Sequence, residues 1–415
     1  MTRRVKWIAI AVVTALTGAL IATVARDPLY WKRYMLSLVY SPTNLPDSFY
    51  EPSDLIEGGD DYPPPRVQPE VEHLAAAALR SAEEYAGARH TRALIVGRHG
   101  HIVFERYWGD ARFDSVIDAG AFNATITALM VGLALDDKKI GLIVEPVANY
   151  IEEFRADDRS NITIENLLRG TSGLAAPEGG RGPWSAAARE RFSSDISREC
   201  LGRRAVHRAG EHGAPHACDV QLLARAVERA TGQPYASYIS ARLWKPIGAS
   251  DAYLSRDSEA GTPRADCCLR ARQGDWMRIA ELLLNDGKFA GEQVIAPGWV
   301  KQMRATPNDR PGFGFQVWRG SSSVANAAPA AAAPDQASEP YAADDTYLLK
   351  AAGKTRLWFV PSLGLSILRV GTNRDDDADW DDARIPNLIV RGASDFVLRA
   401  ANPGSTDFST LVPNH

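Results

Sequence analysis

The stretch Ala93-Leu-Ile-Val-Gly-Arg-His-Gly-His-Ile-Val-Phe-Glu-Arg-Tyr107 contains two short runs rich in β-branched and aromatic residues. The runs cover residues 93–96 and 102–107, and both have the composition typical of strands. Between them, Gly97-Arg98-His99-Gly100 carries the glycines that a tight turn needs. The stretch therefore predicts a β-hairpin.

The rest of the chain indicates where this hairpin belongs. Further strand-like runs occur only near the carboxy-terminal end, at residues 314–319, 355–360 and 364–370. Helical periodicity dominates between the two ends, with helices expected at 71–86, 119–137, 219–231, 235–243, 274–285 and 297–303, and a last one at 385–399. The segment 119–137 is apolar enough to be a buried helix. β-rich ends around a helical middle predict one α+β unit whose sheet is built from both ends of the chain.

Composition excludes several classes of protein. The chain has 415 residues, of which 45% are hydrophobic and 24% charged, close to the average for a soluble globular protein. Its net charge of -4 and pI near 6.1 leave no global basic field, so nucleic acid is not expected as a partner. Four cysteines are too few for a small disulfide scaffold.

The amino-terminal end predicts a membrane anchor over residues 1–28. Arg3, Arg4 and Lys6 precede an uncharged run at 7–25, which as a helix would span roughly 28 Å, the thickness of the hydrocarbon core. The basic residues favour a cytoplasmic amino terminus, with the body in the periplasm or outside the cell. A cleaved signal peptide and a buried core helix are the alternatives, although the run exceeds the usual h-region of about 7–15 residues.

Two further segments differ in composition from the body of the chain. Residues 29–69 begin with an aromatic and basic belt and continue in a stretch rich in Pro, Gly and acidic residues, which predicts a juxtamembrane segment and an extended tether. The body is expected at 70–402. Within it, the Ala/Pro/Ser tract at 321–343 predicts a disordered loop, and residues 403–415 form a tail.

Several segments carry a family resemblance. They read Ala93 to Tyr107 as quoted above, Arg112-Phe-Asp-Ser115, Thr127-Ala-Leu-Met-Val-Gly-Leu-Ala-Leu-Asp136, Ile162-Thr-Ile-Glu-Asn-Leu-Leu-Arg-Gly-Thr-Ser-Gly-Leu174, Gln221-Leu-Leu-Ala-Arg-Ala-Val-Glu-Arg-Ala-Thr-Gly232, and Cys267-Cys268-Leu269 ahead of Asp275-Trp276. In order and wording they resemble the beta-lactamase-related serine hydrolases, which include class C β-lactamases, esterases and 6-aminohexanoate-dimer hydrolases. The resemblance covers about residues 70–400. It implies a beta-lactamase/transpeptidase-like fold: an antiparallel sheet flanked by helices, a helical lobe, and a cleft between them.

The first motif that this resemblance implies is Ser-x-x-Lys at the start of the buried helix. The lysine lies one turn from the serine and can take its proton, which turns a poor nucleophile into a good one. Anchored on Thr127-Ala128-Leu129, this chain reads Ala121-Phe122-Asn123-Ala124. Both the nucleophile and the lysine are therefore expected to be alanine, at Ala121 and Ala124.

The second implied motif is Tyr-x-Asn or Tyr-x-Ser before a later helix, which relays a proton. Anchored on Asp219 and Gln221, this chain reads Pro215-His216-Ala217-Cys218, so Pro215 and Ala217 occupy the motif positions. His216 is a weak candidate for the relay, since a lone loop histidine is more often simply solvated.

The third implied motif is Lys-Thr-Gly or His-x-Gly on a late strand, which orients the substrate. Lys350-Ala-Ala-Gly353 and Lys354-Thr355-Arg356 compete for it, and the second lies too close to Val360-Pro361 for the usual spacing. Lys350 and Lys354 are therefore weak catalytic candidates, and a structural or surface role is more typical of either lysine.

Other constellations leave alternatives open. Thr125 and Thr127 are conceivable nucleophiles, but no base is evident beside them. Cys200, His207, His212, His216 and Cys218 place five zinc-compatible side chains within 19 residues. A Cys200–Cys218 disulfide accounts for the same cysteines outside the cytoplasm and contributes roughly 3 kcal/mol. Differently paired thiols are a further alternative, with Cys267 or Cys268 reaching Cys200 or Cys218. The disulfide is favoured, and no metal is expected.

These observations predict a single-pass protein of the cytoplasmic membrane with a degenerate catalytic site. We expect it to bind a small-molecule or peptidoglycan-like ligand, or a partner, in the cleft without a cofactor. The alternative is an active amide or ester hydrolase, acting on a β-lactam or short peptide with a displaced nucleophile or a metal. A third possibility is a scaffold that recruits partners through its anchor and its Ala/Pro loop.

Overall fold

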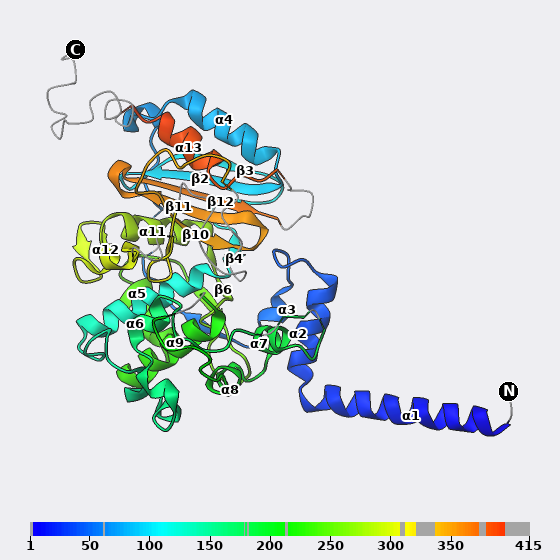
Figure 1. Ribbon diagram of the computed structural model, residues 1–415. Helices are drawn as coiled ribbons and strands as arrows, with labels where there is room; N and C mark the ends of the chain where they lie inside the picture. Colours follow the sequence, from blue (N-terminus) through cyan, green and yellow to red (C-terminus); the bar gives the residue numbers. More distant parts are fainter. Residues whose placement is uncertain are drawn as a thin grey trace, which may run out of the picture.

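The main structural feature is a six-stranded antiparallel sheet built from both ends of the chain (Figure 1). The computed structural model describes residues 3–60, 63–177, 179–180, 182–211, 215–307, 312–320, 337–372 and 379–394. The strand order is β3-β2-β12-β11-β10-β9. The strands are β2 (Thr91–Arg98), β3 (His101–Tyr107), β9 (Trp318–Arg319), β10 (Tyr347–Ala351), β11 (Thr355–Val360) and β12 (Leu365–Gly371). The expected α+β unit with a sheet drawn from both ends is confirmed.

The hairpin that opens the sheet has the turn that its sequence predicts. Strands β2 and β3 pair antiparallel, and the two residues that join them, His99 and Gly100, have φ of 48° and 84°. Two consecutive positive φ values are typical of a type I′ turn, which suits the twist of the flanking strands.

Helices cover both faces of this sheet (Figure 1). Helices α4 (Ala76–Gly87) and α13 (Arg384–Arg391) lie on one face, where their apolar side chains form one core with those of the strands. Helix α11 (Gln273–Leu284) packs on the other face. Residues of each strand alternate between the two cores, so that on β10 Leu348 faces α4 and α13 whereas Leu349 faces the opposite side.

Helix α5 (Phe122–Asp136) is the buried helix that the apolar segment predicts. Every side chain from Phe122 to Ala134 is buried. The helix packs against α9 (Ala217–Thr231) and α12 (Trp299–Arg304). Gly132 permits the close approach of α12, because a Cβ at that position would lie 2.2 Å from Nε1 of Trp299. The indole Nε1 of Trp299 in turn donates to the carbonyl of Ala128 at 3.2 Å.

A second, four-stranded sheet was not predicted. Its order is β1-β5-β6-β4, formed by β1 (Ser53–Ile56), β5 (Ala252–Ser255), β6 (Leu269–Arg272) and β4 (Val116–Asp118). Shorter elements include α6 (Ile164–Leu168), α7 (Ala186–Phe192), α8 (Ile196–Leu201), α10 (Tyr235–Ile239), β7 (Lys288–Phe289) and β8 (Glu292–Gln293). Helix α10 lies within the helix expected at 235–243. The other short helices and these strands carry too little periodicity to be seen in the sequence.

The prediction of an extended tether at residues 29–69 needs correction. Helix α2 (Pro28–Val39) and helix α3 (Asp47–Tyr50) lie in this segment, and β1 pairs antiparallel with β5. Phe49 and Tyr50 are buried. The Pro- and Gly-rich composition suggested an extended chain, but strand pairing and aromatic burial fold the segment onto the body.

The predicted Ala/Pro loop is described only at its end. Residues 321–336 of this loop and the tail at 403–415 lie outside the described residues. Residues 337–343 pack on the sheet instead of forming a loose loop: Tyr341 is buried, and the N–H of Ala342 donates to Oδ1 of Asn387 on α13 at 2.7 Å. This aromatic ring and this hydrogen bond anchor the end of the tract.

The amino-terminal helix α1 (Arg3–Arg26) extends away from the body (Figure 1). Its exposed apolar side chains include Trp7, Ile8, Ile10, Val12, Val13, Leu16, Leu20 and Ile21. In the part of the chain that the structure describes, no single helix has both the length and the apolar character needed to cross a membrane. One bent pair, Ile10–Arg26 and Pro28–Val39, meets both requirements together, with an angle of 102° between its halves. The single straight span expected at residues 7–25 is not supported.

Candidate functional site

The start of helix α5 carries two alanines where the resemblance places the nucleophile and its base. Ala121 is exposed and immediately precedes the helix, and Ala124 is 8% exposed. The N–H of Ala124 donates to the carbonyl of Ala121 at 3.1 Å, so the two residues are one turn apart. A methyl group neither attacks a carbonyl carbon nor accepts a proton. These two positions therefore supply neither a nucleophile nor a base.

The strand that leads into α5 is held by a buried carboxylate. Asp118, at the end of β4, accepts hydrogen bonds from the hydroxyl of Tyr50 at 3.0 Å and from the N–H of Gly120 at 2.9 Å. Burial raises the pKa of Asp118 above its usual value. A Cβ at Gly120 would lie 3.7 Å from the Cβ of Ala351, so the end of β10 lies beside the start of α5. The amino-terminal segment thus contacts the site through Tyr50.

The threonines of α5 are engaged in packing. The hydroxyl of Thr125 donates to the carbonyl of Gln316 at 2.7 Å, and Thr125 is 1% exposed. The hydroxyl of Thr127 lies 2.8 Å from that of Tyr235 on α10, and Thr127 is fully buried. Among the described residues neither threonine contacts a base. Thr125 donates to a backbone carbonyl, and burial raises the pKa of Tyr235, so the hydroxyl beside Thr127 keeps its own proton.

His216 lies just before α9 and contacts Asp219 within that helix. Its Nε2 is 3.4 Å from Oδ1 of Asp219, and its side chain is 11% exposed. Burial, assisted by the charge of Arg203, lowers the pKa of His216 to about 4. Burial also raises the pKa of Asp219 well above its usual value, against the effect of the Ser172 hydroxyl. Both shifts favour the uncharged forms of the pair, and His216 is a weak base.

Pro215 and Ala217, at the other positions of this motif, have side chains without a proton to relay. The motif positions before α9 therefore lack the hydroxyl group, and those at the start of α5 lack the hydroxyl and the amine, that the implied chemistry uses.

The two candidate lysines do not face α5. On β10, Ala351 points toward the α5 side, and Lys350 points to the other face, where its Nζ lies 4.4 Å from the ring centroid of Trp318. The strand partner of Lys350 is Arg356, which pairs with Asp382 at 2.7 Å. Lys354 lies in the turn after β10 at φ 54°, and its carbonyl accepts from Arg369 at 2.9 Å. Both lysines occupy structural positions.

The four cysteines form two disulfides, Cys200–Cys218 between α8 and α9, and Cys267–Cys268 between sequence neighbours. Cys267 or Cys268 was considered as an alternative partner for Cys200 or Cys218, and neither makes that bond. No group of three or more His, Cys, Asp or Glu residues that could hold a metal occurs in the described ranges. His212 lies outside them.

Comparison with known protein families matches residues 67–382 to the family described as Beta-lactamase. The chain belongs to the beta-lactamase family.

Relatives with different names share this family. The chain is 28% identical over 232 residues to Esterase EstB of Burkholderia gladioli, covering 49% of this chain and 58% of the esterase. It is 23% identical over 241 residues to a 6-aminohexanoate-dimer hydrolase of Paenarthrobacter ureafaciens, covering 55% of this chain and 61% of that enzyme. The chain thus spans about three fifths of the length of these relatives.

Solved structures show the same fold at low identity. A penicillin-binding protein homologue from Caulobacter crescentus superimposes with a TM-score of 0.55 at 13% identity, covering 81% of this chain and 98% of the homologue. A family VIII carboxylesterase superimposes with a TM-score of 0.58 at 15% identity, covering 78% of this chain and 98% of the carboxylesterase. These likenesses establish the beta-lactamase/transpeptidase-like fold.

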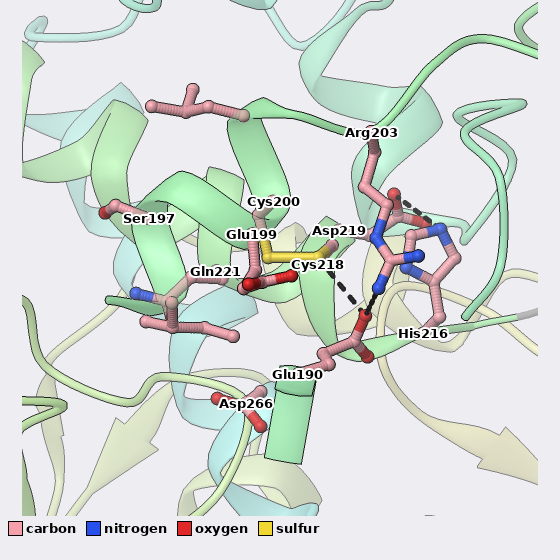
Figure 2. The surroundings of a disulfide bond; sticks show 12 residues. Glu190, Ser197, Glu199, Cys200, Arg203, His216, Cys218, Asp219, Gln221 and Asp266 are labelled. Atoms are coloured by element: carbon pink, nitrogen blue, oxygen red, sulfur yellow. Dashed lines mark hydrogen bonds and ion pairs between the residues drawn. A yellow bond between two sulfur atoms is a disulfide. The ribbon is translucent and has the colours of Figure 1, made fainter. Parts of the chain in front are cut away.

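This beta-lactamase-family chain also has a buried charged cluster that sequence reasoning missed (Figure 2). Glu190 on α7 pairs with Arg203 at 2.7 Å, beside the Cys200–Cys218 disulfide. Burial raises the pKa of Glu190, although Arg203 opposes the shift. The cluster consists of four charged residues that follow no motif spacing, so the sequence pattern did not indicate it: Glu190, Arg203, Arg264 and Asp266.

Arg264 links this cluster to the start of α5. It is 2% exposed, and its Nη2 donates to the carbonyl of Glu190 at 2.9 Å and lies 3.5 Å from Oδ2 of Asp266. Its Nε and Nη1 have no hydrogen-bond partner within the described residues. The Nδ2 of Asn123 on α5 donates to the carbonyl of Arg264 at 3.2 Å, and the Oδ1 of Asn123 also lacks a partner there. Asn123, which lies between Ala121 and Ala124 in the sequence, is therefore joined to the residue that carries the other unsatisfied donors.

The amino-terminal segment covers the neighbouring surface with aromatic side chains. Tyr30, Trp31 and Tyr34 of α2 contact Trp184 and Phe192, with ring centroids 5.2 to 6.3 Å apart. The hydroxyl of Tyr30 also donates to the carbonyl of Pro183. This packing fixes α2 against α7, the helix that carries Glu190.

Proposed function

We propose that this member of the beta-lactamase family binds a ligand beside the start of α5 without catalysing acyl transfer. The observation that supports this most directly is the pair Ala121 and Ala124, which leaves the first turn of α5 without a nucleophile or a base. Groups of this kind act as a unit, so the loss of either one removes most of the rate. A fold by itself confers no activity.

The groups that surround the two alanines offer no substitute. His216 contacts no hydroxyl that could serve as a nucleophile within the described residues, and its low pKa makes it a poor acceptor of protons. Thr125 is buried against a backbone carbonyl, and Lys350 lies on the far face of the sheet. An acyl-enzyme mechanism would have to find its nucleophile elsewhere.

The same region retains groups that suit binding. The Nε and Nη1 of Arg264 are buried donors that find no partner among the described residues, and a buried donor of this kind costs about 1–3 kcal/mol unless a ligand or water satisfies it. Arg191 on α7 is exposed and lies close enough to Asp118, which precedes α5, for their charges to interact. The guanidinium groups of Arg264 and Arg191 favour a ligand rich in carboxylate or carbonyl oxygens, as a peptidoglycan-like peptide is.

Membrane tethering is part of this proposal. The exposed apolar side chains of α1, the basic residues that precede it and the bent pair formed with α2 all support an anchor that places the body in the periplasm or outside the cell. The two disulfides are of the kind that persists in those compartments. Resistance of the full chain to carbonate extraction from membranes would support the anchor, and release into the supernatant would contradict it.

The rival proposal is an active amide or ester hydrolase, favoured by the names of the two curated relatives. The deciding experiment measures hydrolysis of nitrocefin and of a short-chain p-nitrophenyl ester by the full chain in nanodiscs, with and without EDTA. We expect no hydrolysis above buffer and no labelling by a fluorophosphonate probe. Hydrolysis that EDTA abolishes would indicate a metal, and hydrolysis that EDTA leaves unchanged would indicate a displaced nucleophile. Either result would overturn the proposal.

A further inference from the structure

A cavity of about 640 Å³ lies at the end of the main sheet where the β2–β3 hairpin turns. Its walls are the hairpin tip, helix α11, the β7–β8 hairpin and the proline-rich residues 63–65. None of its lining residues belongs to α5, α7 or α9. Sites for small molecules occupy roughly 300–1,000 Å³, so this volume is sufficient for a ligand.

The walls of this cavity are held in place before any ligand arrives. The carboxylate of Glu72 lies 2.7 Å from Nδ1 of His99 and 2.6 Å from Nδ1 of His101, and thereby clamps both sides of the hairpin turn. Gly97 lets α11 approach β2 closely, because a Cβ there would lie 3.0 Å from Cε of Met277. A preformed site loses little entropy when it binds.

Much of the lining is apolar. Ile102 and Met277 are each 4% exposed and contribute side chains from β3 and α11, and Phe289 of β7 is half-buried. A ligand body placed here would remove apolar surface from water on both sides, at about 25 cal/mol per Å².

Glu281 is the acidic group of this lining. The amide of Asn285 and the N–H of Gly100 donate to its carboxylate, which leaves lone pairs for a ligand. His99 and His101 also line the cavity, and their charges oppose the rise that burial causes in the pKa of Glu281, but within the described ranges neither forms an ion pair with it. Arg278 lines the cavity as well and pairs with Asp275. Lys288 lines the same cavity but is exposed and makes no contact with Glu281. A half-buried carboxylate that forms no ion pair within the described residues attracts a positively charged ligand group.

We propose that this cavity binds a small amphipathic amine, whose ammonium group pairs with Glu281 while its apolar body lies against Ile102, Met277 and Phe289. The site is separate from the α5 region, and the inference holds whether or not the chain is catalytic.

The test uses 4-phenylbutylamine as the probe, with 4-phenylbutyrate and 4-phenylbutan-1-ol as matched compounds of opposite and zero charge. Isothermal titration is done on the full chain in zwitterionic nanodiscs, with empty nanodiscs as the blank. We expect saturable binding of the amine, at least tenfold tighter than that of the acid or the alcohol. Glu281→Gln should weaken it at least tenfold. Glu292→Gln removes the same charge from the exposed neighbouring strand β8 and should leave it unchanged.

A charge-reversal variant distinguishes a change in ligand preference from a loss of binding that is caused by misfolding. Glu281→Lys should bind the acid in preference to the amine. Three results would overturn the proposal: no saturable binding of the amine, equal binding of the three compounds, or unchanged amine binding by Glu281→Gln. A Glu281→Lys variant that unfolds like the unmodified chain but still prefers the amine would also overturn it.

Discussion

The Nη1 of Arg33 donates to the carbonyl of Asp257 at 2.8 Å, and this bond joins helix α2 to a loop 224 residues further along the chain. The same guanidinium donates to the carbonyls of Phe49, Ser193, Glu51 and Arg256. Arg33 is 1% exposed, and burial together with the nearby charge of Arg264 lowers its pKa to about 10. One residue of the amino-terminal helix α2 thus organises carbonyls from three distant parts of the fold.

Arg33→Met should therefore destabilise the body by about 3–5 kcal/mol, because it leaves several buried carbonyls without a donor. Urea unfolding followed by tryptophan fluorescence measures this loss. Lys32→Met removes a positive charge from an exposed position on the same helix and should change stability by less than about 0.5 kcal/mol. Equal effects of the two variants would show that α2 does not depend on the Arg33 bonds.

Ala121→Ser should not create a hydrolase. The new hydroxyl would stand at an exposed position with Ala124 where the lysine is expected and Pro215 where the tyrosine is expected, so no neighbour would take its proton. We expect hydrolysis of a p-nitrophenyl ester to stay at the buffer rate and the free energy of unfolding to change by less than about 0.5 kcal/mol. Activity that appears with this single change would reveal a base that the present assignment misses.

The sequence predicted the features that depend on local pattern. The turn residues His99 and Gly100 specify the hairpin, and continuous apolar character specifies α5 as a buried helix. In the structure Ala121 immediately precedes α5, and Ala124 lies one turn later; that these are the motif positions stays a prediction.

The features that the sequence did not reveal depend on contacts between distant residues. The fold of residues 29–69 rests on Arg33 and on the pairing of β1 with β5, and neither leaves a periodic pattern. The contact of Glu190 with Arg264 joins positions 74 residues apart. Composition could indicate only that the amino-terminal segment is rich in turn-forming residues.

Acid should destabilise the fold through His216. The unfolded chain binds a proton at this imidazole near pH 6.5, whereas the folded chain does so only near pH 4. Stability is therefore lost as the pH falls through this window, by up to about 3 kcal/mol. The raised pKa of Asp219 acts in the opposite sense, since its contribution is lost as the pH rises. The midpoints of urea unfolding between pH 7 and 4.5 measure the sum of the His216 and Asp219 contributions to stability.

His216→Gln should make this dependence shallower, because glutamine does not titrate. A steeper slope in His216→Gln would mean that His216 is charged in the folded state and that its pair with Asp219 is an ion pair.

The two disulfides should contribute unequally to stability. Cys200–Cys218 closes a loop with a sequence separation of 18, so its loss in Cys200→Ala/Cys218→Ala should cost about 3 kcal/mol through the entropy of the unfolded chain. Cys267–Cys268 joins adjacent residues and constrains almost none of that entropy. The corresponding double variant should lose less than about 1 kcal/mol. Urea unfolding compares the two, and peptide mapping without reductant checks the pairing. A fragment that joins Cys200 to Cys267 would contradict the assignment, and equal losses would show that the Cys267–Cys268 bridge acts through the folded state.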